Sequence, residues 1–179
     1  MHPRLCRAVA AGCGALILAG TPPAAASGTT GAPDRDAIRS IIVAEARNMS
    51  LAPQLALAVA HAESFFDPAA ESRKGARGVM QIMPATAIGE YGIHPDRLWD
   101  PRINIRLGIH FLKRLLRRYR GDKDLALSYY NGGADVGNLP FARVIPVTYG
   151  YVRRVRSLEL YYLRTLRSGG DRRWTNVRR

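Results

Sequence analysis

The sequence predicts a mainly α-helical protein with one globular domain, and three observations support this fold class. Apolar residues recur at helical spacing in several segments, no segment alternates apolar and polar residues as a half-buried strand does, and no internal repeat is present. The 179 residues are enough for one ordinary domain. With 17 glycines and 11 prolines, the composition excludes collagen-like and wholly disordered chains.

Residues 1–26 have the features of a secretory signal peptide. Arg4 and Arg7 precede an apolar stretch, and small residues at 24–26 suit cleavage before Ser27. A buried N-terminal helix is the alternative, and Thr21-Pro22-Pro23 disfavours it. We therefore expect an exported, periplasmic protein. No transmembrane segment is expected in the mature chain, because no apolar run reaches the roughly 18 residues of a membrane span.

The mature chain is expected to contain no cysteine and to remain strongly basic. Cys6 and Cys13 both lie in the signal segment, so neither disulfides nor thiolates are expected afterwards. The full sequence has 27 Lys and Arg against 14 Asp and Glu, a net charge of +13. Such a charge favours an anionic partner. Since an exported protein seldom meets nucleic acid, an anionic polymer of the cell envelope is the better expectation.

A lead-in at 27–33 is expected to be disordered, and the domain proper is expected to span 34–167. Asp34 is predicted to cap a first helix, whose apolar face contains Ile38, Ile41, Ile42 and Ala46. Pro53 suits the first turn of a second helix that ends near Ser64. This second helix is apolar nearly all round and should therefore be buried.

The middle of the chain is expected to be more irregular. Asp67-Pro68 and Gly75 predict a loop over 67–77, which leaves room for a short β-hairpin. Two short helices, Gly78–Met83 and Ala85–Tyr91, are predicted on either side of Pro84.

The longest predicted helix runs from about Arg102 to Tyr119, with leucines on one face and arginines on the other. Asp122 is expected to start the next helix, which leads to a turn at 131–133. A final helix is predicted from near Val147, with Val152, Val155, Leu158, Tyr162 and Leu166 at helical spacing. Residues 168–179 form a basic tail.

Glu63 is the first candidate for chemistry, because it ends the predicted buried helix and is followed by Phe65-Phe66. A carboxyl group among apolar side chains loses hydration, which raises its pKa. A raised pKa is what a general acid needs near neutral pH. The structural alternative is a helix-end glutamate that pairs with an arginine or caps the backbone.

Two further segments suit a binding groove, although each also has a structural interpretation. The segment 75–84 places Met80 and Gln81 beside two glycines, which suits a groove wall or an ordinary turn with methionine packing. Tyr129-Tyr130-Asn131 suits a polyhydroxylated ligand or a buried aromatic pair with a helix cap. His61, His94 and His110 show no metal-ligand spacing, so neither a metal nor a cofactor is expected.

Taken together, these segments resemble the catalytic domain of soluble, goose-lysozyme-like lytic transglycosylases. The resemblance covers roughly residues 36–160. The matching elements are Ala58-Val59-Ala60-His61-Ala62-Glu63-Ser64, Gly75-Ala76-Arg77-Gly78-Val79-Met80-Gln81-Ile82-Met83-Pro84, Asp100-Pro101-Arg102-Ile103-Asn104-Ile105, Ala126-Leu127-Ser128-Tyr129-Tyr130-Asn131 and Tyr151-Val152. It implies a lysozyme-like fold and non-hydrolytic cleavage of peptidoglycan glycan strands between N-acetylmuramic acid and N-acetylglucosamine.

The resemblance also implies roles for individual residues. Glu63 matches the family's single catalytic acid and base, which leaves a 1,6-anhydro product. The substrate-binding positions that match are Ser72, Met80, Gln81, Tyr130, Asn131 and Tyr151. The chain departs from the usual family pattern at Gly132 and at Tyr149-Gly150, which puts local loop shape and sugar-subsite detail in question.

Other functions remain open at this point. A hydrolytic muramidase on the same fold would use Asp67 as a second carboxylate, and a non-catalytic wall-binding scaffold would use only the groove and the basic surface. The small size of the domain is compatible with a role beside a secretion, conjugation or pilus apparatus.

Overall fold

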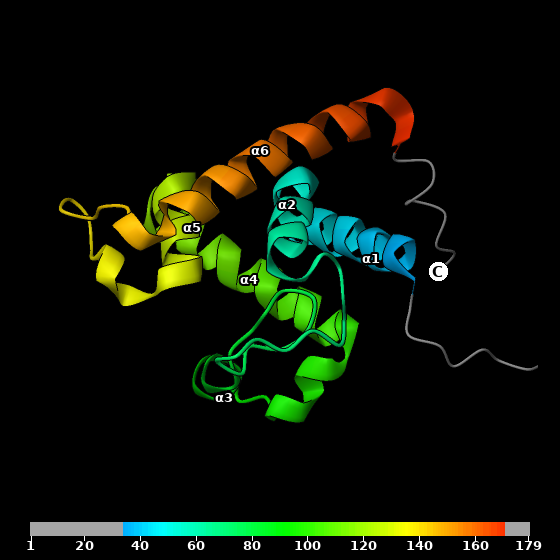
Figure 1. The fold of residues 1–179 in the computed structure, drawn as a ribbon, viewed down its shortest axis with the longest axis horizontal. Helices are drawn as coiled ribbons and strands as arrows, with labels where there is room; N and C mark the ends of the chain where they lie inside the picture. The colour runs from blue at the N-terminus through cyan, green and yellow to red at the C-terminus, as the bar shows by residue number, and fades with distance from the viewer. Residues whose placement is uncertain (1–33, 171–179) are drawn as a thin grey trace, which may run out of the picture. The chain divides into compact units, whose positions relative to one another are not determined.

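The computed structural model describes residues 34–170, in which the regular elements are helices (Figure 1). The α-helices are α1 (Arg35–Asn48), α2 (Pro53–Ser64), α3 (Pro84–Tyr91), α4 (Pro101–Arg118), α5 (Lys123–Gly132) and α6 (Tyr149–Thr165). Short 3-10 turns lie between them at η1 (Pro95–Trp99), η2 (Ala134–Val136) and η3 (Pro146–Thr148), and a π-helical turn η4 (Leu166–Gly170) follows α6. The mainly helical fold class is confirmed.

Several predictions fall on other parts of the chain. The expected signal peptide at 1–26, the lead-in at 27–33 and residues 171–179 of the basic tail lie outside the described residues. Among the helices that are described, none has both the length and the apolar character that crossing a membrane would require.

Helix α2 forms the centre of the hydrophobic core. Every residue from Leu55 to Ala60 is at most 1% exposed, as expected for a helix that is apolar on all sides. Helices α1 and α6 pack against it, and Figure 1 shows α6 crossing over α2. Helix α4 packs against α1 and α5, and its N-terminus is capped by Asp100, whose carboxylate accepts from the N–H groups of Arg102 and Ile103.

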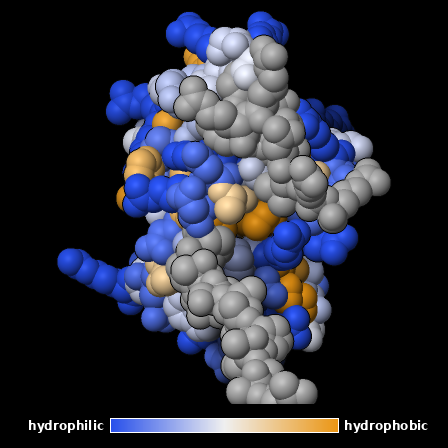
Figure 2. Space-filling view, turned by 90° about the vertical axis from the view of Figure 1, so that its right-hand side faces the viewer, coloured by the Kyte–Doolittle hydropathy of each residue, from blue (hydrophilic) through white to orange (hydrophobic). Residues whose placement is uncertain are grey.

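The outer surface carries the basic character of the chain. Figure 2 shows the face at the right-hand side of Figure 1, where hydrophilic side chains predominate and the visible hydrophobic patches are separate. Helix α4 has the same division between an apolar buried face and a basic exposed face, since Leu112 and Leu115 are buried whereas Arg114, Arg117 and Arg118 are exposed.

The segment Gly78–Met83, predicted as a helix, is instead a series of turns. Gly78 and Gln81 have φ angles of 72° and 48°, which a right-handed helix excludes. The hairpin expected in the 67–77 loop is reduced to isolated antiparallel bridges, Glu71 with Arg77 and Arg77 with Ile82.

Three helix ends also differ from the prediction. Helix α5 continues through Gly132, and the chain leaves the helix only at Gly133, where φ is 82°. Helix α6 begins at Tyr149, because a 3-10 turn occupies the three preceding residues. Asp34 stands at the N-cap of α1, but its side chain makes no capping hydrogen bond.

Candidate active site

Glu63 lies in the last turn of α2, one residue before the helix ends. The helix ends because Phe65 adopts the left-handed conformation, with φ of 55°, and its N–H closes on the carbonyl of His61. The hydroxyl of Ser64 donates to the carbonyl of Val79 at 2.8 Å. This contact joins the end of α2 to the turns at 78–83, so both segments are held beside the carboxyl of Glu63.

The carboxyl of Glu63 is hydrogen-bonded to a tyrosine of α6. The phenol of Tyr151 donates to Oε1 of Glu63 at 2.6 Å. Burial raises the pKa of Glu63 from 4.5 to about 7, although the hydrogen bond from Tyr151 and the positive charge of Arg154 act in the opposite direction. At neutral pH this carboxyl group therefore exists in both its protonated and its charged form.

Tyr130, from α5, is the second tyrosine near this carboxyl. Burial raises its pKa well above the usual value, and the charges of Glu63 and Tyr91 add to that effect. Its hydroxyl donates to the backbone carbonyl of Met80 at 2.8 Å. Tyr151 likewise has a raised pKa, mainly through burial and then through the charge of Glu63. Both phenols therefore remain neutral and can donate a hydrogen bond.

Met80 is fully buried and packs against α4 where that helix has a glycine. A Cβ on Gly108 would lie 2.5 Å from the Cβ of Met80, so this close approach requires glycine. The backbone N–H of Met80 donates to the side-chain oxygen of Asn104 at 2.7 Å. The side chain of Met80 lies beneath the surface and is not exposed to a ligand in this structure. Its expected role in substrate binding therefore stays a prediction.

Asn104 is a residue of the site that the sequence analysis did not single out. Its fully buried amide also donates to the carbonyls of Arg77 and Leu98, at 2.7 and 3.1 Å. It therefore satisfies three backbone groups that the turns at 77–80 and η1 leave unpaired. The sequence did indicate that Asn104 is buried, because position 104 lies on the same helical stripe as Gly108, Leu112 and Leu115.

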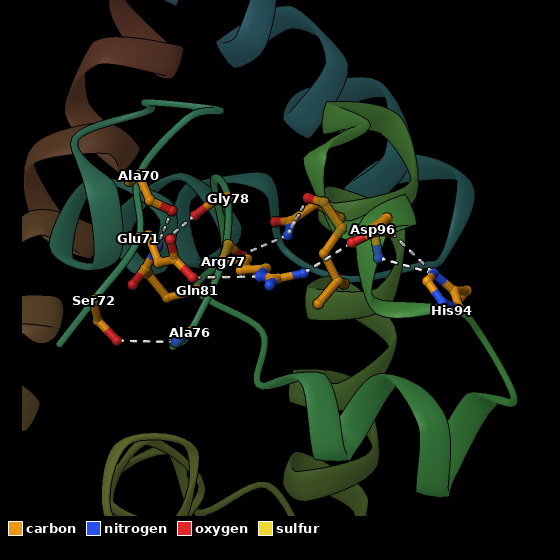
Figure 3. A network of polar contacts seen from close by, with 11 residues as sticks. Ala70, Glu71, Ser72, Ala76, Arg77, Gly78, Gln81, His94 and Asp96 are labelled. Atoms are coloured by element: carbon orange, nitrogen blue, oxygen red, sulfur yellow. Dashed lines mark hydrogen bonds and ion pairs between the residues drawn. The ribbon is translucent and has the colours of Figure 1, made fainter. Parts of the chain in front are cut away.

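Ser72 lies in the loop that leads into these turns, and Gln81 lies within the turns themselves (Figure 3). The hydroxyl of Ser72 accepts from the N–H of Ala76 at 3.0 Å, which closes the tip of the loop. The amide of Gln81 donates to the carbonyls of Ala70 and Gly78, at 3.0 Å each, so it fastens one strand of the loop to the other.

The same loop is anchored to η1 by charged groups, which Figure 3 also shows. The guanidinium of Arg77 reaches Glu71 at 3.5 Å and Asp96 at 3.3 Å, and Asp96 lies 3.5 Å from His94. These exposed pairs each contribute little to stability, but together they connect the loop to the segment before α4.

Asn131 is exposed in the last turn of α5, directly after Tyr130, and its side chain makes no hydrogen bond to another residue of the 34–170 range. The structure thus brings Glu63, Tyr130 and Tyr151 together around one carboxyl group, with Met80 beneath them. Within residues 34–170, no three Asp, Glu, His or Cys residues are grouped closely enough to hold a metal ion.

This arrangement can donate a proton to a bound group and later accept one. Comparisons of this chain's sequence and of its structure both find lytic transglycosylases. The family model described as the transglycosylase SLT domain matches residues 40–139. The soluble lytic murein transglycosylase of Salmonella typhimurium is 31% identical over 138 residues, which cover 65% of this chain and 21% of that protein.

Two solved structures show the same similarity. An inactive glutamate-to-glutamine mutant of a lytic transglycosylase from Pseudomonas aeruginosa aligns with a TM-score of 0.62 and 30% identity, over 72% of this chain and 24% of that one. The 70 kDa soluble lytic transglycosylase of Escherichia coli aligns with a TM-score of 0.59 and 29% identity, over 68% of this chain and 24% of that one. The lysozyme-like fold class is confirmed, and this chain spans about a fifth to a quarter of the relatives' length.

Proposed function

Because the chain belongs to the family of transglycosylase SLT domains, we propose that it is a lytic transglycosylase that acts on peptidoglycan. It cleaves the β-1,4 bond between N-acetylmuramic acid and N-acetylglucosamine without adding water. The observation that carries this proposal is the buried carboxyl group of Glu63, with its pKa of about 7 and its hydrogen bond from Tyr151.

In the first step, protonated Glu63 donates its proton to the glycosidic oxygen, and the bond between that oxygen and C1 of the muramic acid breaks. In the second step, the carboxylate removes the proton of the C6 hydroxyl, whose oxygen bonds to C1 and closes the 1,6-anhydro ring. Glu63 ends protonated, as it began. A pKa near 7 suits a group that must act first as acid and then as base.

One carboxyl group is sufficient because the substrate supplies its own nucleophile. Ordinary glycosidases need a second carboxylate to activate water or to form a covalent intermediate. In the proposed reaction the C6 hydroxyl is already held close to C1 by the sugar ring, which replaces an intermolecular attack with an intramolecular one. Asp67, the nearest candidate for a second carboxylate in sequence, is exposed and accepts from the N–H of Ala69 at 2.8 Å, as turn residues do.

The other site residues are proposed to shape and hold the groove. Tyr151 stabilises the charged form of Glu63 after the first proton transfer, which its 2.6 Å hydrogen bond supports. Asn131 binds the sugar near the scissile bond, which its exposure supports. Tyr130 forms the floor and the buried Met80 supports it from beneath, and Ser72 and Gln81 hold the loop that borders the groove.

The setting proposed for this activity is the periplasm, to which the segment at 1–26 would direct the chain. The excess of basic residues favours an anionic polymer such as peptidoglycan over a neutral polysaccharide. Opening the wall for a secretion or conjugation apparatus is the biological role we propose for a domain of this size.

The test is digestion of purified peptidoglycan followed by mass spectrometry of the products. We expect fragments that end in 1,6-anhydromuramic acid and are one water lighter than hydrolytic products, and we expect none with Glu63→Gln. Reducing ends alone, with loss of activity in Asp67→Asn, would identify a hydrolytic muramidase. Wall opening in cells that persists with Glu63→Gln would identify a non-catalytic scaffold.

A further inference from the structure

Helix α6 has an outer face that the proposed reaction does not use. In Figure 1 the helix runs along the upper edge of the domain, with α2 and α5 below it and no described element above it. Its inner side is packed, since Val152, Val155 and Tyr162 are at most 6% exposed. The outer face is the opposite stripe of the helix, which is exposed throughout and consists of Arg153, Ser157, Leu160 and Arg164, with Tyr161 at its edge.

The charge of this outer face is positive. Arg153 and Arg164 are exposed, and neither forms an ion pair or a hydrogen bond with another residue between positions 34 and 170. Glu159, the one acidic residue of α6, is buried on the inner side and is already paired with Lys123 and Arg156. The outer face therefore presents guanidinium groups that no carboxylate of the helix balances. Such a surface attracts anions and repels a second copy of itself.

Two large apolar side chains are exposed among these charges. Leu160 is 57% exposed and lies two turns after Arg153 and one turn before Arg164. Tyr161 is 58% exposed, and its ring is supported by the ring of Tyr162, with 5.0 Å between the two centres. A polyanionic glycan would pair with the arginines but would leave these apolar groups in water. At a membrane surface the arginines bind lipid phosphates, while leucine and tyrosine side chains enter the headgroup layer.

We propose that the outer face of α6 binds the surface of a membrane that contains anionic phospholipids. Leu160 and Tyr161 enter the headgroup layer, and Arg153 and Arg164 bind phosphates on either side of them. The sequence that follows the helix has the same composition, since residues 171–179 contain four arginines and one tryptophan against one aspartate. The contact is separate from the reaction, because Tyr151 reaches Glu63 on α2, which packs against the inner side of α6.

Flotation of the chain with lipid vesicles tests this proposal. The chain is used from Ser27 onward, which is the expected mature form, so that the apolar stretch of the signal segment does not contribute. We expect binding to vesicles with equal amounts of phosphatidylglycerol and phosphatidylcholine, and none to phosphatidylcholine alone. Added salt should weaken the binding, because it screens the attraction between arginines and phosphates.

Two variants separate the contributions of charge and apolar contact. The double variant Arg153→Gln, Arg164→Gln should bind about 25-fold more weakly, since each arginine near an anionic surface contributes about fivefold in affinity. Leu160→Asn leaves the charge unchanged and should weaken binding about fivefold, because it removes the apolar group that enters the headgroup layer. The matched control is Arg102→Gln, Arg117→Gln, which removes the same charge from exposed positions of α4 and should bind as the unmodified chain does.

Equal weakening in the α6 double variant and the α4 control would overturn the inference, because net charge alone would then explain the binding. Undiminished binding of Leu160→Asn would also overturn it, since no apolar contact with lipid would be made. A third contrary result is a double variant that binds vesicles normally but no longer sediments with insoluble peptidoglycan, which would assign the outer face to the cell wall. None of these measurements requires turnover, so their outcome is independent of the proposed reaction at Glu63.

Discussion

Replacing Glu63 with glutamine should make the protein more stable at alkaline pH, because the substitution removes a buried charge. Glutamine keeps nearly the same shape, and its carbonyl can still accept the hydrogen bond from Tyr151. What it removes is the need to ionise a carboxyl group in an apolar environment above neutral pH. This effect on folding is independent of catalysis, so it tests the burial of the group directly.

The pKa shift sets the size of the effect. A rise from 4.5 in the unfolded chain to about 7 in the folded protein corresponds to about 3 kcal/mol. Between these two values the folded state binds the proton more tightly than the unfolded state does, so the stability of the unmodified protein falls as the pH rises. This loss of stability is absent below pH 4.5 and complete above about pH 7. The advantage of the glutamine variant should follow the same pH range.

Urea unfolding of both proteins at about pH 4 and at about pH 8 measures this difference. We expect the two proteins to be similar in acid and the variant to be about 3 kcal/mol more stable in base. Glu71→Gln is the control, because Glu71 is exposed in the neighbouring loop and its replacement should change stability by less than about 0.5 kcal/mol at either pH. A glutamine variant that gains nothing in base, or gains equally at both pH values, would refute the assignment of Glu63 as a buried carboxyl with a raised pKa.

Three further predictions follow from the contacts around the site. Tyr151→Phe removes a donor that favours the charged carboxylate, so the descending limb of the pH–activity profile should move to higher pH; an unmoved limb would show that the phenol does not act on Glu63. Asn104→Leu leaves three backbone groups without their partner and should lower the free energy of unfolding in urea by about 3 kcal/mol, whereas a change below about 1 kcal/mol would contradict this role. Gly132→Ala places a Cβ 2.7 Å from the methyl group of Thr148. We expect it to cost about 2 kcal/mol in thermal unfolding, and a more stable variant would show that the neighbouring segment yields easily.

Most of the helical framework could be predicted because its causes are local. The apolar stripe of α4 and the all-apolar sequence of α2 are properties of short segments, and so is the proline in the first turn of α2. The carboxyl of Glu63 could be predicted to be buried for the same reason, since residues 58–60 and 65–66 on either side of it are mostly apolar. In the structure α2 is buried from Leu55 to Ala60, and Glu63 at its end is partly exposed as a residue, while burial of its carboxyl group is sufficient to raise its pKa.

The segment at 78–83 was predicted wrongly because its conformation depends on a residue of another helix. Met80 and Gln81 look compatible with a helical turn when the segment is read alone. In the structure the N–H of Met80 donates a hydrogen bond to the side chain of Asn104, from α4. In a helix the same N–H would donate to a carbonyl of the preceding turn. The left-handed conformations of Gly78 and Gln81 complete the turns. No property of the segment by itself contains this information.

The hydrogen bond between Tyr151 and Glu63 depends on another contact that is distant in sequence. The residues that fix the start of α6 come from α5, where the hydroxyl of the fully buried Ser128 lies 2.7 Å from the hydroxyl of Thr148 and accepts the N–H of Ile145 at 2.9 Å. Thr148 donates to the carbonyl of Ile145 at 2.7 Å, so both hydroxyls have partners.

Gly132, where the chain departs from the usual family pattern, is what allows this network to lie so close to α5. The departure at Gly132 was expected to affect local loop shape, and the structure gives the physical reason. The glycine lets Thr148 pack against α5 and so fixes the start of α6, and Tyr151 follows Thr148 by three residues. An alanine at this position should displace the start of α6 and lengthen the hydrogen bond to Glu63. Because that hydrogen bond lowers the pKa of Glu63, Gly132→Ala should move the pH–activity profile in the same direction as Tyr151→Phe, but by less.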